Sequence, residues 1–155
     1  MKKVTCTFPL TQTETKRFAQ KPIAVHWGEF LNTLPWDFYC TFTSRHSLTK
    51  IGARNAMGRL KNHLAIKYGS EPAIFWAAEP FDSKHGYHLH ALLKDNRKSE
   101  SGRISSIKEA WQIVNKGKYG KENKFTTVVP YDPNLGGHYY VAKYLHRHNA
   151  DYDFA

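Results

Sequence analysis

Two histidines separated by one apolar residue, His88 and His90 with Leu89 between them, are the residues of this chain best suited to bind a metal ion. In a β-strand, side chains two residues apart lie on the same face, so the two imidazoles would lie side by side. A catalytic divalent ion usually needs a further ligand, and a carboxylate suits Mg²⁺ or Mn²⁺. Glu79, in the segment before the histidines, is the carboxylate that we expect to complete the site.

The placement of Glu79 depends on the pairing of two predicted strands. Residues 72–79 and 87–93 are rich in apolar and aromatic side chains, and the short connection between them predicts an antiparallel pair. With Glu79 opposite His88, the carboxylate and both imidazoles share one face. A register shift of one residue would move Glu79 to the other face. The alternative is that the histidines are satisfied by hydrogen bonds and that Glu79 is a surface acid.

A second motif, Tyr140-Val141-Ala142-Lys143-Tyr144, brings two phenols and an ammonium onto neighbouring positions at helical spacing. A phenol is a poor nucleophile at neutral pH unless its phenolate is stabilised or its target is activated. A metal ion would activate a phosphodiester, and Lys143 would neutralise charge on the phosphate or favour the phenolate. Metal and tyrosine together predict phosphoryl transfer. The alternative is that one or both tyrosines pack into the core beneath the sheet.

The length of 155 residues predicts a single domain, 1–155, in which residues 1–21 form a peripheral arm because they lack a sustained period. The two cysteines, Cys6 and Cys40, lie far apart in the sequence. Neither a leader segment nor a long apolar run indicates secretion or membrane insertion. We therefore expect a protein of the reducing cytoplasm that has no membrane partner.

The chain carries 23 Lys and Arg against 13 Asp and Glu, a formal net charge of +10 that favours an anionic polymer as partner. Four Trp, nine Tyr and nine Phe accompany these charges, a combination that suits phosphate contacts and base stacking on single-stranded nucleic acid. Arg45, Arg54 and Lys61 are the candidate phosphate contacts. A solvated helix face is the alternative for any one of them.

The other segments complete an α+β pattern. Met57, Leu60 and Leu64 recur at helical intervals in a helix that should end at Gly69. Ser106 and Glu109 have the spacing of a capping box at the start of another helix. The first of these helices is predicted at residues 49–68, and the remaining predictions are strands at residues 36–43 and 125–129 and a last helix at residues 138–148. This order predicts an antiparallel β-sheet flanked by helices.

The motifs of this chain resemble those of the HUH endonucleases, specifically the rolling-circle replication initiator (Rep) proteins of plasmids and single-stranded DNA viruses. Residues 38–43 resemble the first, strand-forming motif of that family. His88-Leu89-His90 resembles its histidine motif, with Glu79 where such proteins often carry a third ligand. Residues 140–144 resemble its tyrosine motif, so that the match extends over most of the chain, from residue 36 to residue 148.

The resemblance implies a ferredoxin- or RRM-like HUH nuclease fold, with the histidines on a central strand and the tyrosine helix across the sheet. It implies sequence- or structure-specific nicking and joining of single-stranded DNA at an origin, through a 5′-phosphotyrosine intermediate and with Mg²⁺ or Mn²⁺. Tyr140 is the expected primary nucleophile, and Tyr144 is the second tyrosine of a pair that could alternate. Because no motor domain fits in this length, we expect a separate helicase, unless the chain is an excerpt of a longer protein, with a polymerase that extends the 3′-hydroxyl.

Two other functions remain open at this stage. The first is a single-tyrosine HUH transposase, although the tyrosine helix of such enzymes more often carries a glutamine where this chain has Lys143. The second is a non-catalytic module that binds single-stranded nucleic acid, in which sheet aromatics stack on bases and the histidines bind no ion.

Overall fold

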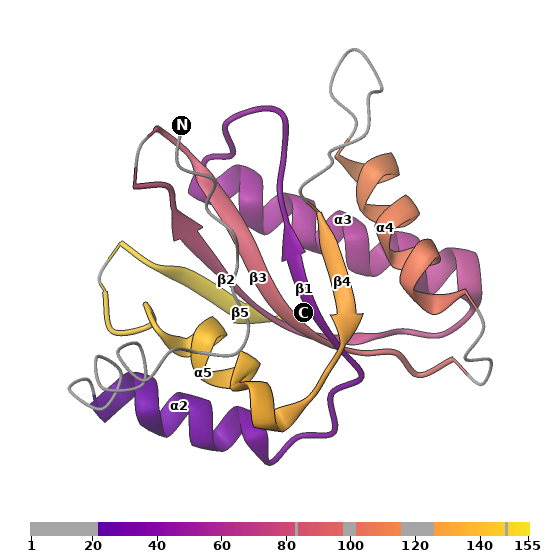
Figure 1. Cartoon of the computed structure of the whole chain (residues 1–155). Helices are drawn as coiled ribbons and strands as arrows, with labels where there is room; N and C mark the ends of the chain where they lie inside the picture. The colour runs from indigo at the N-terminus through magenta and orange to yellow at the C-terminus, as the bar shows by residue number, and fades with distance from the viewer. Residues whose placement is uncertain (1–21, 83, 98–101, 116–125, 148) are drawn as a thin grey trace.

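The computed structural model describes residues 22–82, 84–97, 102–115, 126–147 and 149–155. These residues form a mixed α+β fold built on one antiparallel sheet of five strands (Figure 1). This confirms the predicted fold class, whereas the predicted arm, residues 1–21, lies outside the described residues. The strands run in the order β4-β1-β3-β2-β5 and comprise β1 (Phe38–Phe42), β2 (Ala73–Pro80), β3 (Tyr87–Lys94), β4 (Thr127–Pro130) and β5 (Asp151–Phe154).

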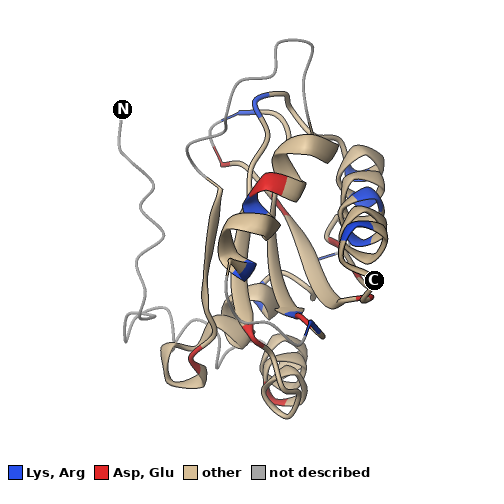
Figure 2. Cartoon of the chain, turned by 90° about the vertical axis from the view of Figure 1, so that its right-hand side faces the viewer, with Lys and Arg blue, Asp and Glu red and all other residues tan. Residues whose placement is uncertain are grey.

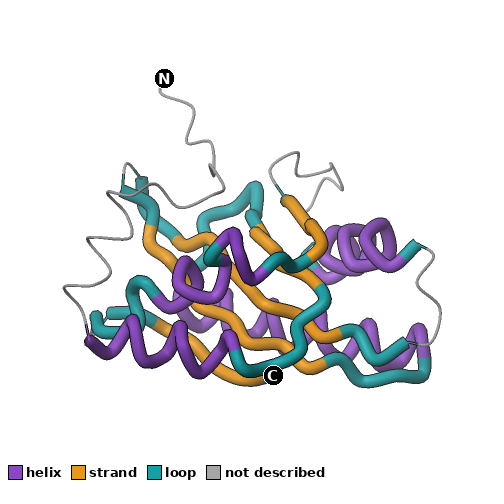
Figure 3. Tube along the Cα trace, turned by 60° about the horizontal axis from the view of Figure 1, so that its bottom comes forward, coloured by secondary structure: helices purple, strands orange, loops and turns teal. Residues whose placement is uncertain are grey.

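Helices cover both faces of the sheet, as Figure 3 shows from below. One face carries α2 (Pro22–Asn32) and α5 (Gly137–Ala142), and the other carries α3 (Lys50–Tyr68) and α4 (Arg103–Val114). From β1 to β4 the chain follows a β-α-β-β-α-β path with strand order 4-1-3-2, the connectivity of a split β-α-β unit. The narrower ferredoxin- or RRM-like HUH nuclease fold stays a prediction.

The alternation of side chains along β3 separates two cores. Leu89 and Leu93 pack with the buried residues of α3 and α4, whereas Leu92 packs on the α2 and α5 side. His90 lies at an even-numbered position like Leu92 and therefore faces α5. Since β1 and β2 flank β3, the histidine strand lies in the middle of the sheet with neighbours on both edges.

The predicted helix at residues 49–68 is confirmed as α3. Thr49 is its N-cap, and the Thr49 hydroxyl accepts the backbone N–H of Gly52 at 2.9 Å. Gly69 ends the helix in the left-handed conformation at a φ of 64°. The buried apolar face includes Met57, Leu60 and Leu64, as its spacing predicted.

The predicted capping box of the next helix is wrong. α4 begins at Arg103, and its N-cap is Gly102, whose φ of 72° is readily adopted by glycine. Ser106 lies inside the helix, where its hydroxyl donates to the carbonyl of Arg103 at 2.9 Å. That hydroxyl therefore bonds within the first turn, and Ser106 lies four residues beyond the N-cap position that a capping side chain would occupy.

The predicted final helix at residues 138–148 is also wrong in its length. α5 ends at Ala142, and residues 143–147 form turns. Backbone N–H groups in these turns bond to the carbonyl three residues earlier, as Leu145 does to Ala142 at 3.1 Å. The chain here turns toward β5, so Tyr140 and Tyr144 do not share one continuous α-helix.

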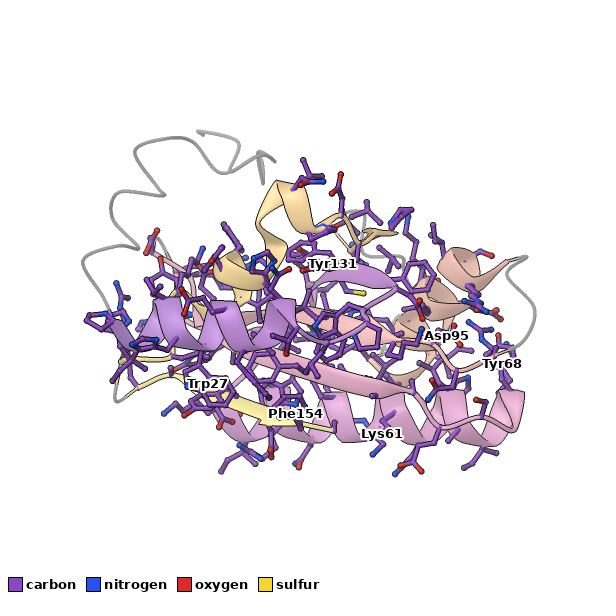
Figure 4. All side chains as sticks on the ribbon, turned by 90° about the horizontal axis from the view of Figure 1, so that it is seen from below. Trp27, Lys61, Tyr68, Asp95, Tyr131 and Phe154 are labelled. Atoms are coloured by element: carbon purple, nitrogen blue, oxygen red, sulfur yellow. The ribbon has the colours of Figure 1, made fainter. Side chains whose placement is uncertain are left out.

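The sequence interpretation missed α2 and β5, which pack together at one edge of the sheet. Trp27 of α2 stacks on Phe75 at 5.6 Å, and Phe154 of β5 contacts the same ring at 4.8 Å. Figure 4 shows Trp27 and Phe154 close to one another. Within the described ranges, none of the helices has the length and apolar character that a membrane span requires.

The different surroundings of two helical glycines, Gly28 in α2 and Gly58 in α3, predict opposite effects of their substitution by alanine. A β-carbon on Gly28 would lie 2.2 Å from Cδ1 of Tyr139, so Gly28→Ala should lower the free energy of unfolding by about 1–3 kcal/mol. A β-carbon on Gly58 of α3 meets no atom within 4 Å, so Gly58→Ala should raise it by about 0.5–1 kcal/mol. Urea denaturation of the two variants measures both effects. Equal effects of one sign would contradict this packing.

Candidate metal and tyrosine site

The predicted register of the histidine hairpin is confirmed. Glu79 of β2 pairs with His88 of β3, and Ala77 pairs with His90. The Oε2 atom of Glu79 lies 2.8 Å from Nε2 of His90 and 3.2 Å from Nε2 of His88. One ligand atom from each of the three residues lies within 4.8 Å of the others. These three residues, Glu79, His88 and His90, could therefore bind a metal ion, and we call them the metal-binding group.

Two of these ligand atoms form no hydrogen bond of normal geometry with the described residues. Oε2 of Glu79 and Nε2 of His90 are buried and lack a partner in hydrogen-bond geometry among the described residues, although they lie 2.8 Å apart. A buried polar atom left without a partner costs about 1–3 kcal/mol. A cation bound between the two atoms would satisfy both lone pairs. Two imidazoles and a carboxylate also match the donor types that divalent ions use in proteins.

The other nitrogen of His90 is held by β1. The Tyr39 hydroxyl lies 2.8 Å from Nδ1 of His90, and the Thr41 hydroxyl lies 3.2 Å from it. The sequence predicted this strand, but no role was assigned to Tyr39 or Thr41. Strand alternation contained the signal, since Tyr39 and Thr41 are two residues apart and Thr41 pairs directly with His90.

The protonation of the group follows from its burial and charges. Burial acts to raise the pKa of Glu79, but the neighbouring His88 and His90 and the charge of Lys143 outweigh it, so this pKa lies well below its usual value. Burial lowers the pKa of His90 to about 4, against the opposing effect of the Glu79 carboxylate. At neutral pH the structure therefore presents an ionised carboxylate and a neutral imidazole, the forms that bind metal ions.

These shifts predict that acid destabilises the protein without bound metal. Between pH 6.5 and about 4 the folded state keeps His90 neutral while the unfolded state protonates it, so stability falls as the pH falls through this window. The loss from His90 should reach roughly 2 kcal/mol at about pH 4.5. Glu79, whose pKa is lowered, adds a loss in the same direction below its ordinary value of 4.5.

Urea denaturation in the presence of a chelator at several pH values measures this effect. His90→Gln should flatten the profile between pH 6.5 and about 4, whereas the exposed His26→Gln should leave it unchanged. His138, whose pKa burial also lowers, keeps part of the slope in both variants. A profile of His90→Gln that superimposes on that of the unsubstituted protein would contradict the assignment.

Tyr140 and Lys143 lie against the metal-binding group. The Tyr140 ring meets His90 edge-on, with ring centroids 4.8 Å apart. The Lys143 ammonium lies 2.9 Å from Oε1 of Glu79 and 3.5 Å from the centroid of the Tyr140 ring. Although α5 is shorter than predicted, the structure does bring the tyrosine motif and the histidine motif together.

Tyr144 has different surroundings from Tyr140. Its ring lies 4.8 Å from the Lys143 ammonium and 4.1 Å from the guanidinium of Arg147. Burial raises the pKa of Tyr144 to about 12, and the charge of Glu79 acts in the same direction. The two tyrosines are therefore unequal, because only the first packs its ring against His90.

The structure places two of the three predicted phosphate contacts on the face of the sheet opposite the site. Arg54 of α3 pairs with Asp151 at 2.6 Å and with Asp153, and Lys61 of α3 pairs with Glu71 at 2.7 Å. Figure 2 shows basic positions in blue along the helices of this face, and Figure 4 labels Lys61, away from Tyr131. The third, Arg45, is exposed in the connection after β1. Binding of DNA by these three residues stays a prediction.

The sequence analysis also assigned no role to one aromatic and two basic side chains beside the site, Phe81, Lys84 and Arg147. The Phe81 ring lies 4.8 Å from that of His88, and the Lys84 ammonium lies 4.1 Å from the Phe81 ring. Within the described part of the chain, neither Lys84 nor Arg147 forms an ion pair. The turn composition of residues 80–86 concealed Phe81, which had been counted only as part of a connection.

Comparison of the chain with protein-family models, with curated proteins and with solved structures found no match.

Proposed function

We propose that this protein nicks and rejoins single-stranded DNA at a specific sequence or structure, as an initiator of rolling-circle replication, with Tyr140 as nucleophile. The observation that carries the proposal is the contact of the Tyr140 ring with His90, within a group whose Glu79 also contacts Lys143. A phenol, a cation and three metal-binding side chains therefore converge. This set matches the needs of phosphoryl transfer to a tyrosine.

In this proposal Glu79, His88 and His90 hold Mg²⁺ or Mn²⁺, which would polarise the non-bridging oxygens of a phosphodiester when bound. Lys143, 3.5 Å from the Tyr140 ring, favours the phenolate through its positive charge. The Tyr140 oxygen forms a bond to phosphorus while the bond from phosphorus to the 3′ oxygen breaks. The 3′ oxygen leaves with the electron pair and takes up the proton lost by the phenol.

The products are a free 3′-hydroxyl and a 5′-phosphate esterified to Tyr140. Because an ester bond replaces an ester bond, the reverse reaction can join the ends without ATP. A polymerase would extend the 3′-hydroxyl, and a separate helicase would open the duplex. Tyr144 would act second, since burial and Glu79 raise its pKa to about 12.

Charge and aromatic side chains beside the site support single-stranded DNA as the substrate. The net charge of the chain is +10. Near the metal-binding group, Phe81 offers a partly exposed ring beside His88, and Lys84 and Arg147 offer cations at its margins. Stacking on a ring and neutralisation of phosphates are the contacts that unpaired DNA uses.

A single-tyrosine transposase with the same chemistry is the second candidate, and the unequal surroundings of Tyr140 and Tyr144 favour it over a paired-tyrosine enzyme. The two candidates differ in their targets, because an initiator cleaves an origin and a transposase cleaves the ends of its element. Sequencing of the trapped strands distinguishes them.

The proposal is tested by incubating the protein with a randomised pool of labelled single-stranded DNA and Mn²⁺, followed by denaturing electrophoresis. We expect a covalent adduct that a chelator prevents and that His90→Ala abolishes. His26→Ala, at an exposed histidine of α2, is the matched control and should retain the adduct. Salt-sensitive DNA binding without any adduct would contradict the proposal and would indicate a binding module instead.

A further inference from the structure

We infer that Tyr39 is a positioning residue that orients His90 for the metal ion through its hydroxyl and supports the nucleophile helix α5 through its ring. The inference rests on the proposed function. Tyr39 lies in β1, is 3 % exposed, and is not a member of the metal-binding group or of the tyrosine motif. It lies between these two groups of residues and contacts both.

The hydroxyl of Tyr39 acts on the tautomer of His90. A neutral imidazole carries one proton, so a hydrogen on Nδ1 leaves Nε2 with a lone pair. Tyr39 and Thr41 offer hydroxyl oxygens to Nδ1 at 2.8 and 3.2 Å, and Nε2 lies beside Glu79 at 2.8 Å without a hydrogen-bond partner. When Nδ1 donates to Tyr39, the lone pair of Nε2 is free for an ion. Partners of this kind orient metal-binding histidines and tune their affinity.

The ring of Tyr39 fixes the start of α5. It stacks on the His90 ring with centroids 6.1 Å apart and meets the Tyr140 ring edge-on at 6.4 Å. Gly137, the first residue of α5, lies directly on it, since a β-carbon there would be 3.0 Å from Cδ2 of Tyr39. The same ring therefore limits how closely α5 approaches the sheet. The distance between Tyr140 and His90 follows from that contact.

The two contributions are separable because phenylalanine keeps the ring and removes the hydroxyl. In Tyr39→Phe, His90 keeps only Thr41 as partner for Nδ1, at 3.2 Å, while the packing of α5 is unchanged. We expect the affinity for Mn²⁺ to fall about 10–100-fold, the effect typical of losing such a partner. At saturating Mn²⁺ the maximal rate of adduct formation should stay within about threefold of the unsubstituted protein, because the nucleophile has not moved.

The chain offers a matched control, Tyr131→Phe. The Tyr131 hydroxyl contacts Nδ1 of His138 at 2.7 Å, a bond of the same kind on the same side of the sheet but outside the metal-binding group. This variant removes one tyrosine hydroxyl from one histidine, as Tyr39→Phe does. Its Mn²⁺ affinity should equal that of the unsubstituted protein.

Titration with Mn²⁺ followed by electron paramagnetic resonance tests the inference in Tyr39→Phe, in Tyr131→Phe and in the combination of Tyr39→Phe with Thr41→Val. The double variant removes both hydroxyls that contact Nδ1 of His90, so it should weaken Mn²⁺ binding further than Tyr39→Phe alone. Unchanged Mn²⁺ affinity in Tyr39→Phe, or a double variant that binds Mn²⁺ no more weakly than Tyr39→Phe, would overturn the inference. Failure of the proposed function reads differently, as an unsubstituted protein that forms no adduct, and the Mn²⁺ titration does not depend on adduct formation.

Discussion

Tyr140→Phe is expected to reduce covalent adduct formation with single-stranded DNA by at least about 10³-fold, because phenylalanine has no oxygen to attack phosphorus. The substitution keeps the ring that packs against His90 and Tyr39, so the fold should be retained. The Mn²⁺ affinity should stay within about threefold of the unsubstituted protein, since Tyr140 is not one of the three metal-binding side chains. Gel quantification of the adduct and a Mn²⁺ titration measure the two quantities.

The neighbouring tyrosines provide the controls for this result. Tyr139→Phe should leave the adduct unchanged, because the Tyr139 ring packs against Gly28 and His138 rather than against His88 or His90. Tyr144→Phe should keep the first cleavage, and a defect confined to rejoining would identify Tyr144 as the second nucleophile. A normal adduct in Tyr140→Phe, together with its loss in Tyr144→Phe, would reverse the roles that we assign.

Glu79→Gln is expected to weaken Mn²⁺ binding by at least about 100-fold, because it removes the only carboxylate of the described metal-binding group and leaves two imidazoles. Adduct formation should fall with it. The same change deprives the largely buried Lys143 ammonium of the carboxylate 2.9 Å away, so we also expect a loss of about 1–3 kcal/mol in the free energy of unfolding.

Glu71→Gln is the matched control for Glu79→Gln. Glu71 pairs with Lys61 at 2.7 Å on the opposite side of the sheet, and its side chain is 68 % exposed. Removing an exposed ion pair should change stability by no more than about 1 kcal/mol and should leave Mn²⁺ affinity intact. Isothermal titration calorimetry and urea denaturation of both variants measure these effects. A Glu79→Gln protein that binds Mn²⁺ normally would contradict the metal-binding assignment.

The parts of the fold that sequence reasoning predicted are those with a strong local pattern. The apolar spacing and the terminal Gly69 predicted α3, and the period of two along β3 placed both histidines on one face. The pairing of Glu79 with His88 also followed from the short connection between the two strands. These signals require only neighbouring residues, which is why they could be read without the structure.

The parts that were missed depend on contacts between segments far apart in the chain. β5 contains two aspartates, which disfavour strands, and Arg54 on α3 compensates for them. The end of α5 at Ala142 is set by the path of the chain toward β5 and not by a proline or glycine. Tyr39 could be given a role only once the structure had placed its hydroxyl on His90 and its ring on α5.

The measurement that tests the central claim most directly is mass spectrometry of the covalent complex formed by the unsubstituted protein with single-stranded DNA and Mn²⁺. After digestion of the trapped complex with a protease and a nuclease, we predict a peptide that carries a nucleotide 5′-phosphate on Tyr140. Cleaved DNA without any modified peptide, or a nucleotide attached to a residue outside the tyrosine motif, would contradict the claim that Tyr140 is the nucleophile.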